Sequence, residues 1–236
     1  FAVTSLQFIK RSAPQKALEN VNKQIKEKQF RKLYLFVQRV AVILLLPLLT
    51  LSGILLLQPR EETPVFYLEA RMTPGMIGST VLPDGTKVWL NSSSYLRYPN
   101  LFSGQTREVT LDGEAYFKVA KNTEHPFVVT AGELEVLVTG TTFGVRAYKD
   151  EKDIQTTLES GQVTVRVEGK SVKLVPNKQV LFNKLTMGME VRDVDVDLYL
   201  AWADGRLVYD NCPLEKILTD LGRWYNIDVF YSRDEL

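Results

Sequence analysis

The stretch VAVILLLPLLTLSGILLL, residues 40–57, holds eighteen consecutive residues without a charged side chain. A helix of this length spans roughly 27 Å, close to the roughly 30 Å hydrocarbon core of a bilayer. Pro47 and Gly53 are poor residues for the middle of a soluble helix, but helices that cross lipid tolerate both. The stretch therefore predicts a single membrane span, with a buried core helix as the alternative.

The charges on the two sides of this span predict its orientation. Residues 1–39 contain nine Lys or Arg and two Asp or Glu, whereas residues 64–236 contain nineteen Lys or Arg and twenty-four Asp or Glu. An excess of Lys and Arg beside a span marks the cytoplasmic side, so the large C-terminal part lies outside. A nucleic-acid-binding arm is the competing interpretation of the basic segment. The adjoining apolar stretch favours the membrane, and we expect no direct contact with nucleic acid.

The scarcity of cysteine and histidine excludes several classes of site. Cys212 is the single cysteine, so the chain has no internal disulfide framework. His125 is the single histidine, which excludes a histidine-based triad or metal cluster. We interpret Cys212 as a small buried helix cap and His125 as a loop residue. We expect no catalytic residue, no metal and no cofactor.

From residue 76 onward, short β-branched or aromatic stretches alternate with turn signals, as in antiparallel all-β domains. Three of these signals are Pro83-Asp84-Gly85, Asp112-Gly113 and Glu168-Gly169. Asp112-Gly113 predicts a hairpin between residues 106–111 and 114–119, and Glu168-Gly169 predicts another. We expect ten or more strands over residues 79–194, in a sandwich or a solenoid-like sheet. Carboxylates that lie mostly beside these turns are interpreted as ordinary solvated residues: Asp84, Asp112, Glu114 and Glu159.

Near Asp195 the hydrophobic period changes from two to 3.6. Pro213 stands where a helix would begin, and apolar residues follow at helical spacing: Leu214, Ile217, Leu218, Leu221 and Trp224. Strands are expected on both sides of this helix, at residues 207–209 and 227–231. The pattern predicts a β-α-β unit that begins a small α+β domain. Because the chain starts at Phe1 and stops soon after the second strand, we expect it to be a fragment.

Several ordered blocks of residues resemble one known family. They are LPDGTKVWLN (82–91), LRYP (96–99), VTLDGEAYFKV (109–119) and VTGTTFGV (138–145). Together they resemble the FecR family of transmembrane anti-sigma factors. The tail, with Trp202, LVYDNCPL (207–214) and LGRWY (221–225), looks like the C-terminal domain attached to this family in Bacteroidetes-type bacteria. The resemblance covers nearly all of residues 72–236.

The resemblance implies a regulatory protein rather than an enzyme. In such proteins the outer part binds the periplasmic signalling domain of a TonB-dependent outer-membrane receptor. The cytoplasmic N-terminus holds or activates an extracytoplasmic-function sigma factor and so regulates transcription. The family's periplasmic end is similar to the small secretin and TonB N-terminal fold. We therefore expect a single-pass protein of the bacterial inner membrane, with its N-terminus in the cytoplasm and its C-terminal domains in the periplasm.

The expected chain is mainly β and has five parts. They are a truncated cytoplasmic sigma-binding segment (1–39), a transmembrane helix (40–57), a linker (58–71), a β-rich FecR domain (72–194) and the start of an α+β domain (195–236). For the receptor contact we predict an exposed strand of the last part that adds to the partner's sheet. The residues assigned to this contact are Leu207, Val208, Tyr209, Asp228, Val229 and Tyr231.

A membrane-tethered glycan-binding or envelope-scaffold module is the alternative function. Antiparallel sandwiches can carry exposed aromatic residues that stack on sugars, and the candidates in this chain are Trp89, Tyr95 and Tyr98. The two interpretations differ in whether the partner is a protein or a polysaccharide.

Overall fold

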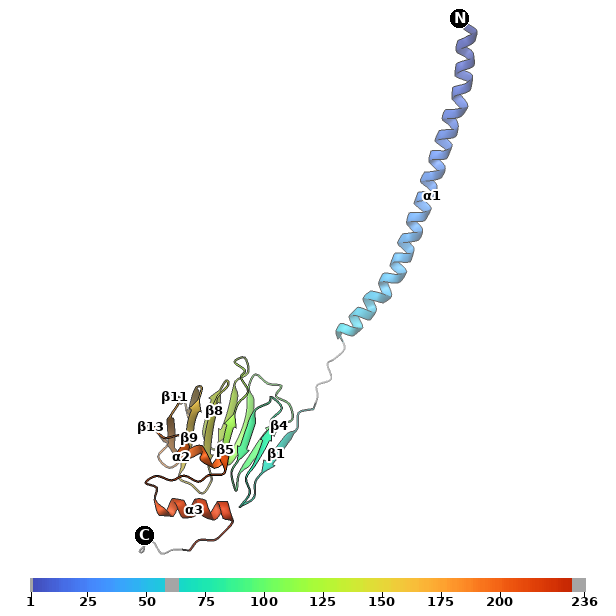
Figure 1. Ribbon diagram of the computed structural model, residues 1–236. Helices are drawn as coiled ribbons and strands as arrows, with labels where there is room; N and C mark the ends of the chain where they lie inside the picture. Colours follow the sequence, from blue (N-terminus) through green and yellow to red (C-terminus); the bar gives the residue numbers. More distant parts are fainter. Residues whose placement is uncertain (1, 58–63, 231–236) are drawn as a thin grey trace. The chain divides into compact units, whose positions relative to one another are not determined.

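The computed structural model describes residues 2–57 and 64–230 (Figure 1). The chain divides into two compact units, Phe1–Thr63 and Pro64–Leu236. The described part of the first unit is one helix, α1 (Ala2–Leu57). Because α1 runs without a break from the basic segment into the apolar stretch, the predicted boundary at residue 40 is a change of composition within one helix.

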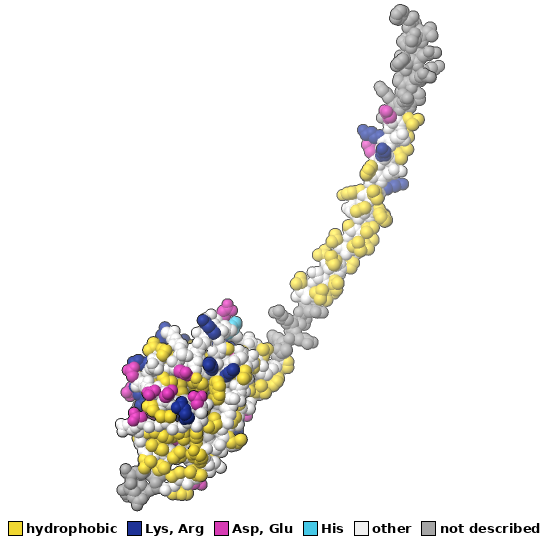
Figure 2. Space-filling model, viewed as in Figure 1, with side chains coloured by type: hydrophobic (Ala, Val, Ile, Leu, Met, Phe, Trp, Pro, Cys, Tyr) yellow, Lys and Arg dark blue, Asp and Glu magenta, His cyan; other side chains and the backbone are white. Residues whose placement is uncertain are grey.

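Helix α1 contains a segment, Val21–Leu56, that is long and apolar enough to cross a membrane, with a mean hydropathy of 2.3 over its most apolar window. None of that window is buried, and hydrophobic side chains surround this part of the helix (Figure 2). The helix continues through Pro47, and the Thr50 hydroxyl donates a hydrogen bond to the Pro47 carbonyl at 2.9 Å. A fully exposed apolar helix of this length is what a lipid-facing span requires, so the chain has the features of a single-pass membrane protein.

The second unit is a β domain that curls around one core. The described part holds thirteen strands, which confirms the prediction of ten or more. They are β1 (Tyr67–Arg71), β2 (Gly78–Val81), β3 (Lys87–Leu90), β4 (Tyr95–Pro99), β5 (Arg107–Lys118), β6 (Phe127–Ala131), β7 (Leu134–Val138), β8 (Thr142–Ala147), β9 (Asp153–Ser160), β10 (Val163–Val167), β11 (Lys170–Leu174), β12 (Lys178–Asn183) and β13 (Gly188–Asp193).

Strand β5 belongs to both halves of the curled sheet. Its first residues pair in sheet A, ordered β11-β10-β7-β6-β5-β4-β1. Its last residues pair in sheet B, ordered β2-β3-β5-β8-β9-β12-β13. The β5–β6 pair is parallel, and the other described pairs are antiparallel. The predicted sandwich-like, antiparallel β domain is therefore confirmed, with one parallel pair at its centre.

The predicted hairpin at Asp112-Gly113 is wrong, because both residues lie inside β5. Gly113 has φ 105° there, and a Cβ at this position would lie 2.7 Å from the Ser94 Cα. A strand that passes from one sheet to the other must bend, and only glycine fits both the positive φ and the close approach of Ser94. The Asp-Gly signal correctly indicates a place of unusual backbone, but it marks a bend within a strand.

The other two turn signals are confirmed. Pro83-Asp84-Gly85 connects β2 to β3, with Gly85 at φ 84° and its N–H donating to the Leu82 carbonyl at 2.9 Å. Glu168-Gly169 closes the hairpin of β10 and β11, in which Val165 lies opposite Val172. These turns join strands that are neighbours in the same sheet, which is the arrangement that a local signal predicts best.

Three buried phenylalanine residues connect the two sheets through the core. Phe117 and Phe143 stack in sheet B with ring centroids 5.1 Å apart. Phe127 of sheet A approaches Phe117 at 6.2 Å. All three side chains are fully buried, within one continuous hydrophobic cluster that draws residues from both sheets. Burying an aromatic side chain of this size contributes about 1.5–3 kcal/mol, so this cluster is the main attraction that holds the sheets together.

Strand β1 corrects the predicted linker. The last five residues of that linker, Tyr67–Arg71, form β1 and pair with β4. The polar and proline-flanked composition indicates an exposed linker, and β1 is indeed largely exposed. It is nevertheless the edge strand of sheet A, because the backbone of β4 offers it a hydrogen-bonding partner.

The C-terminal segment lies against the outer surface of sheet B. It contains α2 (Asp197–Leu200), a 3₁₀ turn η1 (Ala201–Asp204) and α3 (Leu214–Tyr225). Leu200 covers Gly144 of β8 so closely that a Cβ on Gly144 would overlap its side chain. The predicted helix is confirmed as α3, but Pro213 is its N-cap rather than its first residue. Cys212 precedes this cap and is half-buried, so the prediction of a buried helix cap is wrong.

Replacing Gly113 with alanine tests the bend in β5. We expect Gly113→Ala to lower the free energy of unfolding by about 2–4 kcal/mol, because backbone strain and a steric clash with Ser94 add together. Gly169→Ala is the matched control: Gly169 also has a positive φ, 78°, but no atom lies within 4 Å of the place that its Cβ would occupy. The free energy of unfolding of the Gly169→Ala variant should fall by only about 1 kcal/mol. Urea unfolding of the detergent-solubilised chain, followed by tryptophan fluorescence, measures both; equal losses would show that Ser94 does not constrain β5.

Candidate functional site

The residues predicted for the receptor contact lie on two sides of α3. Leu207, Val208 and Tyr209 are half-buried and line a cleft of 340 Å³ between the C-terminal segment and sheet B. Asp228 and Val229 line a different hollow, which includes Leu218 and Gly222 of α3. Tyr231 lies outside the described residues. The structure thus groups the first three residues but does not bring them together with Asp228 and Val229.

The strands predicted at residues 207–209 and 227–231 are absent from the described residues. Residues 207–209 follow Gly205, which ends η1 in the left-handed conformation, and they precede Asn211 at φ 44°. Within the described part of the chain, the backbone N–H groups of residues 207–212 donate no hydrogen bond to another backbone group. The side-chain pattern fits a strand, but a strand also needs a neighbouring strand to pair with.

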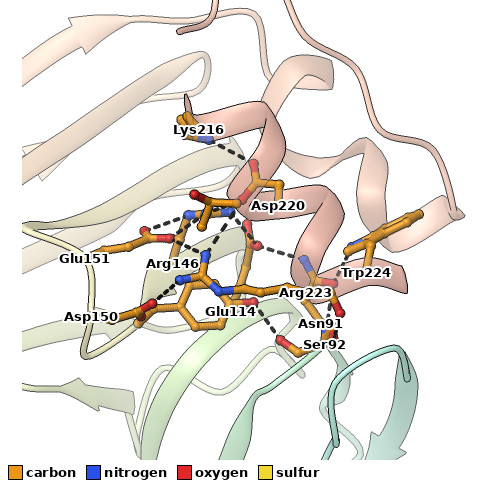
Figure 3. A network of polar contacts seen from close by, with 12 residues as sticks. Asn91, Ser92, Glu114, Arg146, Asp150, Glu151, Lys216, Asp220, Arg223 and Trp224 are labelled. Atoms are coloured by element: carbon orange, nitrogen blue, oxygen red, sulfur yellow. Dashed lines mark hydrogen bonds and ion pairs between the residues drawn. The ribbon is translucent and has the colours of Figure 1, made fainter. Parts of the chain in front are cut away.

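A buried arginine on β8 organises the contact between the β domain and α3 (Figure 3). Arg146 reaches Glu114 of β5 at 3.1 Å and Asp220 of α3 at 2.5 Å. Its Nε and Nη2 donate to the two carboxylate oxygens of Glu151, at 2.9 and 2.6 Å. The Arg146 side chain is only 11% exposed. Its charge is therefore satisfied by three carboxylates that come from β5, from the loop after β8 and from α3.

Arg223 of α3 makes a second group of contacts with the same loop. Its guanidinium bonds to Glu151 at 2.7 Å and to Asp150 at 2.6 Å, and it lies 4.0 Å above the ring of Tyr148. Its carbonyl accepts hydrogen bonds from the Ser92 hydroxyl at 2.6 Å and from the Gly75 N–H at 2.9 Å. Arg223 thus fixes α3 through its side chain and its backbone.

Trp224 completes the attachment. Its indole N–H donates to the Asn91 side-chain carbonyl at 2.7 Å, and the Asn91 amide donates to Glu114 at 2.8 Å. The tryptophan is thereby connected to the carboxylate that Arg146 neutralises. We call Asn91, Ser92, Glu114, Arg146, Asp150, Glu151, Asp220, Arg223 and Trp224 the docking network, and keep this name below.

Burial and neighbouring charges have opposite effects on the pKa values of Glu114, Asp220 and Arg146 in the docking network. Burial raises the pKa of Glu114, although Arg146 and Asn91 counteract it. Burial would also raise the pKa of Asp220, but the neighbouring Arg146 and Lys216 outweigh it, and that pKa is lowered. Burial opposes the charge of Arg146, yet the carboxylates around it raise its pKa. The Asp220–Arg146 pair is therefore ionised at neutral pH.

The sequence patterns do not predict this network. Glu114, expected to be a solvated residue beside a turn glycine, is buried under α3. Asp84, expected to be solvated in the same way, bonds to the buried Arg107 at 2.6 Å. The available signal is weak: Arg146 is the fifth of the six residues of β8, at an outward-facing position of the alternation, and Asp220 and Arg223 are three residues apart on a helix. In the folded chain the Arg146 side chain is only 11% exposed, and a buried arginine requires carboxylate partners.

The other sequence candidates occupy structural positions. His125 is an exposed loop residue, as predicted, and its carbonyl accepts a hydrogen bond from Arg107 at 2.8 Å. Trp89 packs against Tyr116 with ring centroids 5.4 Å apart, and the Tyr95 hydroxyl donates to Glu69 at 2.7 Å. Tyr98 packs against the edge of the core. The aromatic residues considered for glycan stacking are therefore engaged within the sheet.

The comparisons with known proteins agree with this architecture. A family model described as FecR protein matches residues 70–164, and one described as FecR, C-terminal, matches residues 206–236. Two crystal structures of a protein from Parabacteroides distasonis ATCC 8503, proposed to be an anti-sigma factor, share 31% sequence identity with the chain. The chain belongs to the FecR family. This confirms the family predicted from the sequence.

The match to the solved structures is extensive. The first covers 68% of this chain and 76% of its own, and the second covers 67% and 75%, each with a TM-score of 0.65. No curated protein sequence matches the chain. Within this FecR protein, the docking network joins residues of the FecR match to α3, which lies in the FecR C-terminal match.

Replacing Arg146 with methionine tests the docking network. Methionine keeps the aliphatic stem but leaves Glu114 and Asp220 without their common cation, so we expect the free energy of unfolding to fall by about 3–5 kcal/mol. The control is Lys149→Met, since Lys149 is 87% exposed and pairs with Asp112 at the surface. It should change the free energy by less than about 1 kcal/mol. If urea unfolding showed that the two variants lose similar amounts of unfolding free energy, this result would contradict a buried network.

The pH dependence of unfolding provides a separate test with two signs. Asp220 has a lowered pKa, so its contribution to stability is present above its ordinary value of 3.8 and is lost as the pH falls below it. Glu114 has a raised pKa, so its contribution is largest at low pH and is lost as the pH rises. Between about pH 5 and about pH 3, Asp220→Asn should therefore lose less stability than the unmodified chain, and Glu114→Gln should lose more. Denaturation midpoints at the two pH values measure this; the opposite order would refute the assignment.

Proposed function

We propose that this FecR protein is an anti-sigma factor that relays the state of a partner in the cell envelope to a cytoplasmic sigma factor. The observation that carries the proposal is the combination of a FecR domain, followed by its C-terminal helix, with one exposed apolar helix. The basic residues that precede the apolar stretch support a cytoplasmic N-terminus. The β domain would then lie in the periplasm and the span in the inner membrane.

We assign the two partners by class. The periplasmic partner is the signalling domain of a TonB-dependent outer-membrane receptor, and the cytoplasmic partner is an extracytoplasmic-function sigma factor. The family membership and the similarity to a protein proposed to be an anti-sigma factor support these assignments. The role is regulatory rather than enzymatic.

Residues 207–209 provide the receptor contact in this proposal. They border an open cleft, and their N–H groups donate to no other backbone group in the described part of the chain. A partner strand that pairs here would satisfy those groups and form the strand that the side-chain pattern favours. Asp228 and Val229, on the other side of α3, and Tyr231 belong to the same assignment.

The docking network offers a way for such a contact to change the rest of the protein. Tyr209 approaches Asp220 at 3.4 Å, and Asp220 is the carboxylate that connects α3 to Arg146. A strand that pairs with residues 207–209 would therefore lie next to Asp220, the residue through which α3 contacts Arg146. Coupling between two sites is typically about 1–3 kcal/mol, which is less than the expected cost of breaking a buried ion pair, about 3–5 kcal/mol. Receptor binding would thus shift the equilibrium between docked and undocked α3 without breaking all the ion pairs of the docking network.

Capture from native cell envelopes tests the proposed function. The chain is tagged in its natural context, the envelopes are solubilised in detergent, and bound proteins are identified by mass spectrometry. We expect a sigma factor and a TonB-dependent receptor with an N-terminal signalling domain to be enriched, and a reporter of the captured sigma factor to respond to the receptor's ligand. Recovery of glycan without either protein would contradict the proposal and favour an adhesive module.

Proline substitution tests the strand addition. Val208→Pro removes one backbone N–H from the segment and should abolish receptor capture, while sigma-factor capture remains unchanged. Val208→Ala is the control at the same position, because it removes side-chain atoms but keeps the N–H, and it should capture the receptor nearly normally. Equal capture by the two variants would mean that the receptor does not pair with this backbone.

A further inference from the structure

The start of the β domain exposes a short row of apolar side chains. Val65, Phe66, Tyr67 and Leu68 have exposed fractions of 47%, 56%, 57% and 40%. Leu101, in the loop after β4, is exposed by 43%. We call residues 65–68 and Leu101 the apolar edge. Single exposed apolar residues are normal on soluble proteins, but four consecutive ones need a partner or a function.

The backbone holds the apolar edge in place. The Phe66 N–H donates to the Asn100 side-chain carbonyl at 2.9 Å, and the Asn100 N–H donates to the Phe66 carbonyl at 2.9 Å. Tyr67 lies opposite Pro99, and its ring lies 4.2 Å from the guanidinium carbon of Arg97. The exposed side chains therefore project from an ordered sheet edge, which avoids most of the entropy cost of ordering them on binding.

Only a short stretch of chain separates this edge from α1. Phe66 follows Leu57, the last residue of α1, by nine positions in the chain. Even a fully extended chain of about nine residues reaches at most about 32 Å. The lipid headgroup region is about 5–8 Å thick on each side of the bilayer. The tether therefore sets an upper limit on the distance of Phe66 from the end of α1, and it is long enough for Phe66 to reach the headgroup region.

We propose that the apolar edge docks into the headgroup region of the bilayer that α1 crosses. Phe66 and Leu68 would enter the boundary between headgroups and acyl chains. Tyr67 would sit at headgroup level, where aromatic residues with a polar end are favoured. Arg97, stacked on Tyr67, would meet a lipid phosphate. This goes beyond the proposed function and requires only that α1 spans the membrane.

The distribution of residues along β1 favours lipid over an added protein strand. The apolar residues occupy positions 65–68, which are the two residues before β1 and its first two residues, whereas the rest of β1, farther from α1 along the chain, carries Glu69 and Arg71. A strand that paired with β1 would use the whole edge, and charged residues on an edge discourage such pairing. A bilayer would contact only the end nearest to the tether, and that is the end that is apolar.

Spin-label accessibility of the whole chain in lipid vesicles tests the docking. In a Cys212→Ser background, single nitroxide labels are placed with Val65→Cys, Phe66→Cys, Val191→Cys and Leu48→Cys. The chains are reconstituted in vesicles of phosphatidylethanolamine and phosphatidylglycerol. Collision rates with oxygen, which concentrates in lipid, and with a water-soluble nickel complex are then compared. Val191 is the matched control, because it is a valine of 45% exposure on the edge strand of sheet B.

The labels distinguish failure of the docking from failure of the span. We expect the oxygen-to-nickel ratio at residues 65 and 66 to be several-fold higher than at residue 191 and lower than at residue 48. A ratio at 65 and 66 equal to that at 191, with residue 48 in lipid, would overturn the docking alone. A water-like ratio at residue 48 would overturn both the docking and the membrane relay. Magnetic coupling between labels at residue 66 of two chains, together with low collision rates for both reagents, would assign the edge to a second copy and overturn the docking.

Discussion

One strand has to serve two sheets, and the rest of the β domain depends on how it does so. Strand β5 bends at Gly113, where Ser94 lies too close for any side chain. The next residue, Glu114, lies on the outer face of sheet B because the alternation of β5 continues through the bend, and its N–H donates to the Ser94 hydroxyl at 2.8 Å. Ser94, which packs against the bend at Gly113, therefore also holds the backbone of the first carboxylate of the docking network. The fold and the candidate site meet at this contact.

The docking network attaches α3 through buried charges, whose removal from water costs free energy that apolar packing would not cost. This choice of contacts bears on how precisely α3 is positioned. A buried ion pair gains little over well-packed apolar residues, but it loses several kcal/mol when one partner is displaced. Helix α3 approaches sheet B with Lys216, Asp220 and Arg223, while Leu214 and Tyr225 remain exposed. Apolar packing would tolerate a shifted helix, whereas Arg146 accepts Asp220 and Glu151 in one arrangement only. The network therefore defines the docked position of α3, which would be one of the two states that a relay requires.

Local sequence patterns predict those features that arise locally. The span, the β domain, two of the three turns and helix α3 follow from hydrophobic period and turn chemistry, and the family follows from ordered blocks of residues. The prediction at Asp112-Gly113 is wrong because a hairpin turn and a bent strand can both require a glycine with a positive φ, so the residue type does not distinguish them. The predictions for Glu114 and Asp84 are wrong because burial depends on distant segments. Residues 207–209 have the side chains of a strand, but pairing depends on a neighbour that a local pattern does not reveal.

The attachment of the β domain to the bilayer would decide how a signal can cross the span. The described part of the domain begins at Pro64, only a few residues after α1 ends. If the domain rotated freely on this tether, a change near α3 would exert no directed force on α1, and only cleavage of an exposed tether could carry the signal inward. If the apolar edge is held at the bilayer surface, the domain has a fixed point from which a shift of α3 can act on the span. Apolar insertion is insensitive to salt, whereas the charge contacts that bring a partner close are screened by it. Relay by a shift would therefore survive high ionic strength once the partner is bound, to the extent that Phe66 and Leu68, rather than Arg97, hold the edge at the bilayer.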